Sequence, residues 1–284
     1  MTELVRSDAT AFEPERVFET GWGCVDIREQ AQLRVEAALR ALGASVDTLD
    51  LGDWETAFRA WLHLKEYEGE YRNYAGVLEH CLLEKALEHF LSIALIRPRS
   101  GATGVDVGSC TSVLPSLVRR IYGVRYFEQD LQYPAGVHGD RIGSGADRIP
   151  LEGGRVDFLT LHCAFEHFEG NADTGLIREC SRLLRQGGTA VILPLYLNEA
   201  HCNVTGESDA TARRAIAWDT DATHYSYISD WNNRFGRHYS PDAFMRRVYA
   251  PATASGLTPR LYKVVRWDRI HPALWLRWIL TLQK

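Results

Sequence analysis

Apolar and polar positions alternate in two different ways along this chain, and the change comes near residue 100. Before it, apolar residues recur at the three- and four-residue spacing of amphipathic helices, over residues 27–42, 54–62 and 74–91. Gly43 is expected to end the first helix and Pro98 the third, because the residue before a proline avoids the helical region. We therefore expect residues 1–98 to form a helical cap on the domain that follows.

After residue 98, short runs of aliphatic and β-branched residues alternate with helix-like patterns, which is typical of a mostly parallel sheet with helices on both faces. The predicted helices cover 113–122 and 174–184, and the predicted strands cover 103–107, 124–129, 156–161, 189–195, 260–266 and 274–282. Ser240 followed by Pro241 predicts the start of a further helix, with serine as its cap. The pattern indicates an α/β domain over residues 99–284.

Composition narrows the class of protein without deciding its function. The chain has 284 residues, of which 45% are hydrophobic and 24% charged, the balance of a soluble globular protein. Its net charge of −5 argues against a nucleic-acid surface, and no apolar run approaches the roughly 18 residues of a membrane span. The first residues show no leader pattern, and the six cysteines form no CxxC pair. We expect a cytoplasmic protein with reduced thiols, without nucleic-acid or membrane partners.

The stretch 103–112 reads Thr-Gly-Val-Asp-Val-Gly-Ser-Cys-Thr-Ser and joins the first predicted strand of the sheet to the helix that follows. Gly108 permits a tight turn, and the start of the helix offers free backbone N–H groups. Ligands of such sheets bind beyond the carboxyl ends of the strands. Asp106, a carboxylate at the end of a central strand, suits a ligand that carries positive charge. Taken alone, the stretch is equally compatible with an ordinary strand-to-helix connection.

Four stretches in order resemble the class I S-adenosylmethionine-dependent methyltransferases. Residues 106–112 resemble the family's first motif, Asp/Glu-x-Gly-x-Gly-x-Gly, with Cys110 and Ser112 where the family has glycine. The other three stretches are 145–151, similar to Asp-Ala-x-x-Leu-Pro-Phe, 156–168 with its Glu-His pair, and 177–188, similar to Glu-x-x-Arg-x-Leu-Lys-Pro-Gly-Gly. The resemblance covers about residues 101–197. It implies a Rossmann-like, seven-stranded, mostly parallel sheet and S-adenosylmethionine as cofactor.

The resemblance also implies which residues hold the cofactor. Asp130 is the best match to the acidic residue that binds the ribose, with Glu128 in reserve, and Ala146 and Asp147 would flank the adenine. Asp106 would lie near the cationic methionine end of the cofactor. The complete implied set is Asp106, Gly108, Ser109, Cys110, Asp130, Ala146, Asp147 and His162.

Residues 198–239 are too long for an ordinary connection, and insertions of this length tend to be functional lids. We expect this insertion to be mobile without ligands and to receive the acceptor, with Tyr196, Arg234, Arg237, His238 and Tyr239 as binding residues. A hydroxyl acceptor benefits from a base near neutral pH, which favours histidine. The candidates for this base are His162, His167, His201 and His224. The predicted function is O-methylation of a small hydroxylated metabolite, a sugar or a natural-product intermediate.

Other interpretations stay open at this stage. The pairs His162-Cys163 and His201-Cys202 follow adjacent predicted strands and could share a zinc ion with Glu166 or His167, although the spacing matches no metal motif and we expect no metal. A non-catalytic binding or scaffold protein is favoured by Cys110 and Ser112 in the glycine positions. A nicotinamide-dependent oxidoreductase would need a Gly-x-Gly-x-x-Gly turn, which residues 106–112 do not supply. A homodimer is compatible with the sequence.

Overall fold

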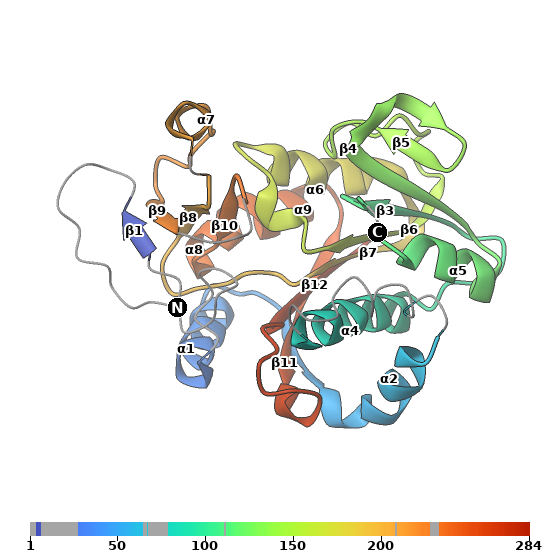
Figure 1. Ribbon diagram of the computed structural model, residues 1–284, viewed down its shortest axis with the longest axis horizontal. Helices are drawn as coiled ribbons and strands as arrows, with labels where there is room; N and C mark the ends of the chain where they lie inside the picture. Colours follow the sequence, from blue (N-terminus) through green and yellow to red (C-terminus); the bar gives the residue numbers. More distant parts are fainter. Residues whose placement is uncertain are drawn as a thin grey trace.

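A large twisted sheet forms the centre of the computed structural model, which describes residues 4–6, 28–64, 67, 79–110, 112–207, 209–227 and 233–284. Its eight strands follow the order β2-β11-β12-β7-β6-β3-β4-β5 (Figure 1). They are β2 (Val46–Asp50), β3 (Thr103–Val107), β4 (Arg125–His138), β5 (Arg141–Gly143), β6 (Val156–His162), β7 (Leu184–Leu193), β11 (Thr258–Val265) and β12 (Trp278–Gln283). β3, β4, β6 and β7 run parallel, and β12 lies antiparallel to both of its neighbours. The predicted α/β class with a mostly parallel sheet is confirmed.

The sheet has one strand more than the seven that the resemblance implied, and two of its eight strands, β2 and β5, were not among the predicted strands. The segment expected to be wholly helical supplies β2, which pairs in parallel with β11 from Val46 beside Leu261 to Asp50 beside Val265. Only Val46 and Leu49 of this strand are buried, so the run has neither the alternation of a half-buried strand nor a long apolar stretch. The described part of residues 1–98 therefore contributes a strand to the sheet as well as helices that cover it.

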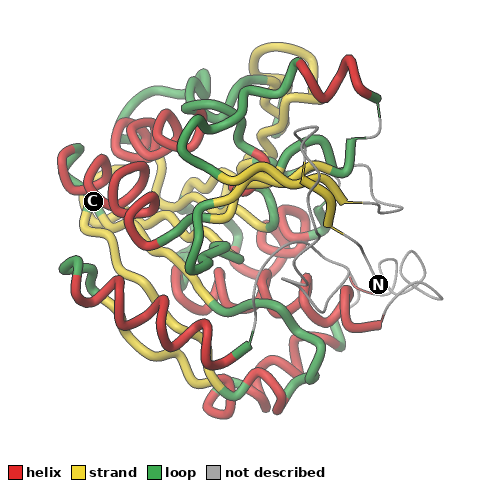
Figure 2. The backbone as a smooth tube through the Cα atoms, turned by 90° about the vertical axis from the view of Figure 1, so that its left-hand side faces the viewer, coloured by secondary structure: helices red, strands yellow, loops and turns green. Residues whose placement is uncertain are grey.

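Helices cover both faces of the sheet (Figures 1 and 2). On one face lie α1 (Glu29–Ala41), α6 (Ala172–Leu183) and a continuous helix made of α8 (Pro241–Phe244), the π-helical turn Met245–Tyr249 and α9 (Ala250–Ala254). The other face carries α2 (Glu55–Leu62), α4 (Glu79–Ile96) and α5 (Leu114–Tyr122). Ser240 caps α8 as predicted, because its hydroxyl accepts the N–H of Ala243 at 3.2 Å. Among the described residues, no helix is long and apolar enough to cross a bilayer.

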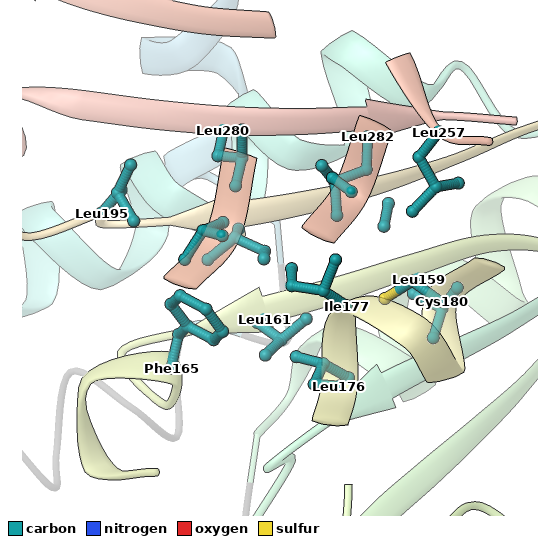
Figure 3. Close-up of a cluster of buried hydrophobic side chains, with 14 of the residues drawn as sticks. Leu159, Leu161, Phe165, Leu176, Ile177, Cys180, Leu195, Leu257, Leu280 and Leu282 are labelled. Atoms are coloured by element: carbon teal, nitrogen blue, oxygen red, sulfur yellow. The ribbon is translucent and has the colours of Figure 1, made fainter. Parts of the chain in front are cut away.

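The core on the α6 side is formed by alternate residues of the central strands. Leu159 and Leu161 of β6 and Leu280 of β12 point toward Ile177 and Cys180 of α6, and all five are fully buried (Figure 3). Each leucine or isoleucine of this kind contributes about 1.5–3 kcal/mol relative to an exposed side chain. This packing fixes β6, whose carboxyl end carries His162.

β4 continues well past its predicted end at residue 129. Its first half runs parallel to β5, and its last residues fold back to pair with β5 a second time, His138 beside Arg141. Asp130 therefore lies inside a strand rather than in the loop after it.

The insertion 198–239 supplies three of the four strands of a second, smaller sheet of order β1-β9-β8-β10, and β1 comes from the start of the chain. Its strands are β1 (Leu4–Arg6), β8 (Cys202–Thr205), β9 (Thr223–Tyr227) and β10 (Gly236–His238), and the short helix α7 (Ala210–Arg214) joins β8 to β9. All residues of β8 and β10 are buried. The described part of the insertion is thus a folded subdomain rather than a long loop.

Candidate active site

The loop after β3 is tightly bound to β4. Gly108 has a φ of +68°, and a Cβ there would lie 2.7 Å from the Cβ of Ala164, so only glycine fits. The carboxylate of Asp130 accepts the backbone N–H of Cys110 at 2.9 Å and that of Gln132 at 2.9 Å. Asp130 therefore shapes this loop, and its oxygens keep further lone pairs for a ligand. Glu128 is ion-paired with Arg119 at 3.0 Å and cannot easily replace it.

Buried polar atoms without hydrogen-bond partners gather at the carboxyl ends of the strands. Within the described residues, Asp106 Oδ2 at the end of β3, Ser109 Oγ just after it, Ser144 Oγ after β5 and Glu166 Oε2 after β6 have no partner. Leaving such a group unsatisfied costs about 1–3 kcal/mol each. A polar ligand at this edge would satisfy them.

Asp106 and His162 lie side by side on the neighbouring strands β3 and β6. Nδ1 of His162 lies 3.2 Å from Asp106 Oδ1, and because a carboxylate only accepts, this nitrogen carries the proton. Thr160 donates to the same oxygen at 2.6 Å, and it also contacts the hydroxyl of Tyr126. Nε2 of His162 lies 3.0 Å from the hydroxyl of Ser92 on α4. The pair is thus oriented from three elements.

One face of α4 adds polar groups that the sequence analysis did not single out. Glu84, Glu88 and Ser92 are spaced by four residues, lie on one side of the helix and are fully buried. Glu88 accepts the ammonium of Lys85 at 2.9 Å and the thiol of Cys163 at 3.1 Å. The spacing of four residues places these polar side chains on one face of a helix, but such a face ordinarily points to solvent, so the sequence did not mark them as site residues.

A second histidine on α4 lies against the first. The ring of His89 meets the ring of His162 edge-to-face at 4.9 Å, and its Nδ1 lies 3.1 Å from the hydroxyl of Tyr67. Burial, together with the nearby His162 and Lys85, holds the pKa of His89 well below its usual range. His89 is therefore neutral at physiological pH and adds no charge beside His162.

Two residues predicted to bind the acceptor hold the subdomain together instead. The guanidinium of Arg237 is fully buried and donates to Asp219 at 2.6 and 2.8 Å, to Gly170 O at 2.8 Å and to Phe168 O. The hydroxyl of Tyr239 donates to Asp173 at 2.9 Å. The guanidinium of Arg237 and the hydroxyl of Tyr239, which would have to bind the acceptor substrate, are therefore already hydrogen-bonded within the protein.

The remaining acceptor candidates divide between the surface and the strand ends. Arg234 is exposed and paired with Glu169 at 2.6 Å. Tyr196, just after β7, and His238 are buried, and their ring centroids lie 5.1 Å apart. Burial, and then the nearby Cys163, Glu166, Glu88 and Glu84, raise the pKa of the Tyr196 hydroxyl well above its usual value.

Three of the four histidine candidates for the base are bound to backbone carbonyls. His201 contacts His238 O at 3.1 Å and lies 3.2 Å from Asp219, and His224 contacts Asp219 O at 2.7 Å. His167 contacts Phe235 O. His162 lies 3.2 Å from the buried carboxylate of Asp106. His167 also lies near a strand-end carboxylate, 3.6 Å from Glu166, but its other ring nitrogen is bound to Phe235 O. His162 is therefore the candidate that the geometry favours.

The adenine candidates lie just beyond β5. Ala146 is half-buried against the core on the α6 side, and Asp147 is exposed. The two His-Cys pairs do not form a common site: Cys163 is bonded to Glu88, and Cys202 lies 3.8 Å from the side-chain nitrogen of Asn198. In the part of the chain that the structure describes, no group of three or more metal-ligating residues could hold an ion.

The central part of the chain matches a known protein family. Residues 103–192 match the family model of a methyltransferase domain, and this range contains β3 to β7 with Asp106, Asp130 and His162. These residues form a methyltransferase domain. None of the curated proteins matches the chain. The predicted resemblance to the methyltransferases is confirmed for this segment of the chain.

Solved structures with a similar fold are methyltransferases of low sequence identity. A putative methyltransferase in complex with the Trm112 activator from Haloferax volcanii is 16% identical, with 80% of this chain and 96% of that chain covered and a TM-score of 0.45. The 1,6-didemethyltoxoflavin-N1-methyltransferase of Burkholderia thailandensis is also 16% identical, covering 84% and 92%, with a TM-score of 0.45. Geranyl diphosphate methyltransferase is 13% identical, covering 78% and 86%, with a TM-score of 0.45.

The methyltransferase family implies S-adenosylmethionine as the methyl donor, and the strand ends of this domain fit it. This cofactor carries a sulfonium, an ammonium and several hydroxyls. The unpartnered oxygens of Asp106, Ser109 and Ser144 offer a carboxylate and two hydroxyls to groups of that kind. The tight turn at Gly108 brings the backbone close to the same edge.

Replacing Cys110 tests the conformation of the loop after β3. Cys110 has a φ of +45°, a left-handed conformation that costs a residue with a Cβ about 1–2 kcal/mol. We expect Cys110→Gly to be more stable than Cys110→Ala by about 1 kcal/mol in urea denaturation, since both lack the thiol and only glycine relieves the strain. An alanine variant as stable as the glycine variant would contradict this account of the loop.

Proposed function

We propose that this methyltransferase methylates an oxygen atom of a small hydroxylated metabolite and that His162 accepts the proton. The observation that carries the proposal is the contact between Asp106 and His162 among buried, unpartnered polar groups at the strand ends. Methylation of a hydroxyl needs a base near neutral pH, and a histidine held by a carboxylate supplies one.

When bound, S-adenosylmethionine would supply an electrophilic methyl group; as the acceptor oxygen gains the methyl, the C–S electron pair would stay on the sulfur of the leaving S-adenosylhomocysteine. Asp106 holds the proton on Nδ1 of His162, which leaves Nε2 as the basic nitrogen. The single proton of the Ser92 hydroxyl can be donated to Nε2 at 3.0 Å or to His89 O at 2.9 Å. A hydroxyl of the methyl acceptor can therefore replace Ser92 at Nε2 while Ser92 donates to His89 O. As the new C–O bond forms, Nε2 takes the acceptor's proton.

The cofactor-binding residues in this proposal are those of the loop after β3 and the neighbouring strand ends. Asp106 would meet the charged methionine end, and Ser109 and Cys110 would line the turn beside it. Asp130 would bind the ribose with the lone pairs that the backbone leaves free, and Ala146 and Asp147 would flank the adenine. Tyr196 and His238, whose ring centroids lie 5.1 Å apart, would contact the acceptor.

The test is a calorimetric titration of the purified protein with S-adenosylhomocysteine, before and after Asp130→Asn. We expect the variant to lose about 1.5–3 kcal/mol of binding free energy, the value of a hydrogen bond to a charged group. Glu128→Gln is the matched control on the same strand and should bind as the wild type does. Loss of affinity in the control alone would transfer the ribose role to Glu128. Absence of binding by the wild-type protein would favour a scaffold without turnover.

A further inference from the structure

Two parts of the chain hold the loop after β3, and one of them lies outside the matched domain. On the β4 side, the carboxylate of Asp130 accepts the backbone N–H of Cys110 at 2.9 Å. On the other side, the hydroxyl of Ser112 lies 3.4 Å from Nε2 of His89. His89 belongs to α4, which precedes residues 103–192 in the chain and lies on the same face of the sheet as α5 (Figure 1). A helix from the leading segment therefore contacts the candidate cofactor loop.

Ser112 organises the end of this loop. Its backbone N–H donates to Ser109 O at 2.9 Å and closes the turn between these two residues. Its hydroxyl accepts the N–H of Leu114, the first residue of α5, at 3.2 Å. Ser112 stands where the first motif of the methyltransferases has glycine, and glycine has no side chain to make this contact or the one with His89. The serine therefore joins the loop, the start of α5 and α4.

The ring of His89 is held on its other side as well. Its Nδ1 lies 3.1 Å from the hydroxyl of Tyr67, which accepts the indole N–H of Trp61 at 2.7 Å. The ring of His162 meets it edge-to-face, with the centroids 4.9 Å apart. His89 is buried, so its ring cannot turn without losing these contacts. Nε2 consequently stays directed at the hydroxyl of Ser112.

The contact does not depend on which nitrogen of His89 carries the proton. A neutral imidazole has one donor and one acceptor nitrogen, and the two partners, Tyr67 and Ser112, are hydroxyls that can donate or accept. Both hydrogen bonds can therefore form in either tautomer. Burial, together with the nearby His162 and Lys85, holds the pKa of His89 well below its usual range, so the ring is neutral. A neutral ring suits a loop that receives a cationic cofactor, because it adds no repulsion.

We propose that His89 is a positioning residue for the cofactor: through Ser112 it holds the loop after β3 in the conformation that binds S-adenosylmethionine. The inference rests on the proposed function, in which this loop lines the cofactor, and it adds a residue from outside the matched domain. A loop that is already ordered loses less freedom on binding, so the contact raises cofactor affinity by at most its own free energy.

Calorimetric titrations of the full chain with S-adenosylhomocysteine compare His89→Asn with His89→Gln. Both changes remove the ring, but the asparagine amide takes about the position of Nδ1 and the longer glutamine amide that of Nε2. We expect His89→Asn to weaken binding about three- to tenfold, the factor for one neutral hydrogen bond. His89→Gln should bind within about twofold of wild type. Equal affinity of the two variants would make His89 a packing residue and overturn the inference.

Ser112→Ala tests the same contact from the loop and leaves the ring of His89 in place. It should weaken binding as His89→Asn does, and the double variant should bind no more weakly than either single one, because both remove one contact. Ser116→Ala is the matched control, since that hydroxyl on α5 donates to Val113 O and is exposed. Additive losses in the double variant would mean that His89 and Ser112 act independently, against the inference.

Amide hydrogen exchange without the cofactor gives a second measurement. Residues 108–114 should exchange faster in His89→Asn than in His89→Gln, while α4 should exchange alike in both variants because both lack the ring. Equal exchange of the loop in the two variants would overturn the inference. Absence of cofactor binding by the wild-type protein would contradict the proposed function and this inference together. Wild-type binding with unchanged affinity in His89→Asn would contradict the inference alone.

Discussion

Replacing His162 with glutamine is expected to lower kcat by about 10²–10⁴-fold, the usual loss when a general base is removed. Glutamine can still donate to Asp106, so the orientation of the strand ends is kept while the basic nitrogen is lost. The measurement is the rate of S-adenosylhomocysteine formation at saturating acceptor, from pH 5.5 to 9. The variant should also lose the acidic limb that a histidine base imposes on the pH profile.

The control for this variant is His138→Gln, a change at an exposed histidine near the end of β4 that should keep the wild-type rate. Cofactor affinity of His162→Gln should stay within a few-fold of wild type. An unchanged rate and pH profile would assign the base elsewhere, with His89 the next candidate because its ring contacts that of His162. A large fall in cofactor affinity would instead make His162 a cofactor-binding residue.

Arg237→Met is expected to destabilise the protein by about 3–5 kcal/mol, because it removes the main counter-charge of the buried Asp219 carboxylate. Asp173 loses one of its two arginine partners and keeps Arg247. Arg246→Met is the matched control. Arg246 pairs with Asp221 at the surface, where both side chains are about half exposed, and such a pair is worth about 0–1 kcal/mol. Urea denaturation of both variants measures the difference. Equal, small losses of stability in both variants would mean that Arg237 can bind the acceptor, as the sequence predicted.

The buried Asp219 carboxylate makes the stability of the fold depend on pH in a predictable direction. Burial alone would raise the pKa of Asp219, but hydrogen bonds from His201, Arg237 and Asn203 lower it far below its usual value. A carboxylate with a depressed pKa stabilises the fold above its unfolded-state pKa, which is about 3.9 for aspartate. This stabilisation is lost progressively as the pH falls below about 4.

Elements whose local pattern agrees with their burial could be predicted from the sequence. β3 begins and ends at the predicted residues, and the cap at Ser240 forms as expected, since strand periodicity and capping depend on a few neighbouring side chains. β2 was missed because a five-residue edge strand with two buried side chains carries too little pattern. The small sheet in the insertion was missed because its buried polar groups, such as Asn203 and Arg237, read as surface residues.

In the candidate site, too, some residues could be predicted from local sequence and others depend on tertiary packing. Asp106, Asp130 and His162 could be found because they lie next to strand ends that the sequence marks clearly. Glu84, Glu88 and His89 could not, because a charged residue on a helix is buried only through its tertiary surroundings, here β6, β7 and the chain before β12. Likewise, the sequence around Arg237 is no different from that around a ligand-binding arginine, although in the structure its side chain donates to Asp219.

The extra strand β2 changes how this protein can be divided. Because β2 covers the edge of β11, the end of the sheet is closed by a segment that precedes the methyltransferase domain in the chain. A fragment cut at the apparent boundary near residue 98 would leave the backbone N–H and C=O groups of β11 unpaired, and such an edge invites strands of other molecules. Separating the domain from its leading segment would therefore favour self-association through β11. An exchange of that segment between relatives would have to include both β2, which pairs with β11, and α4, which packs against β6 and β7.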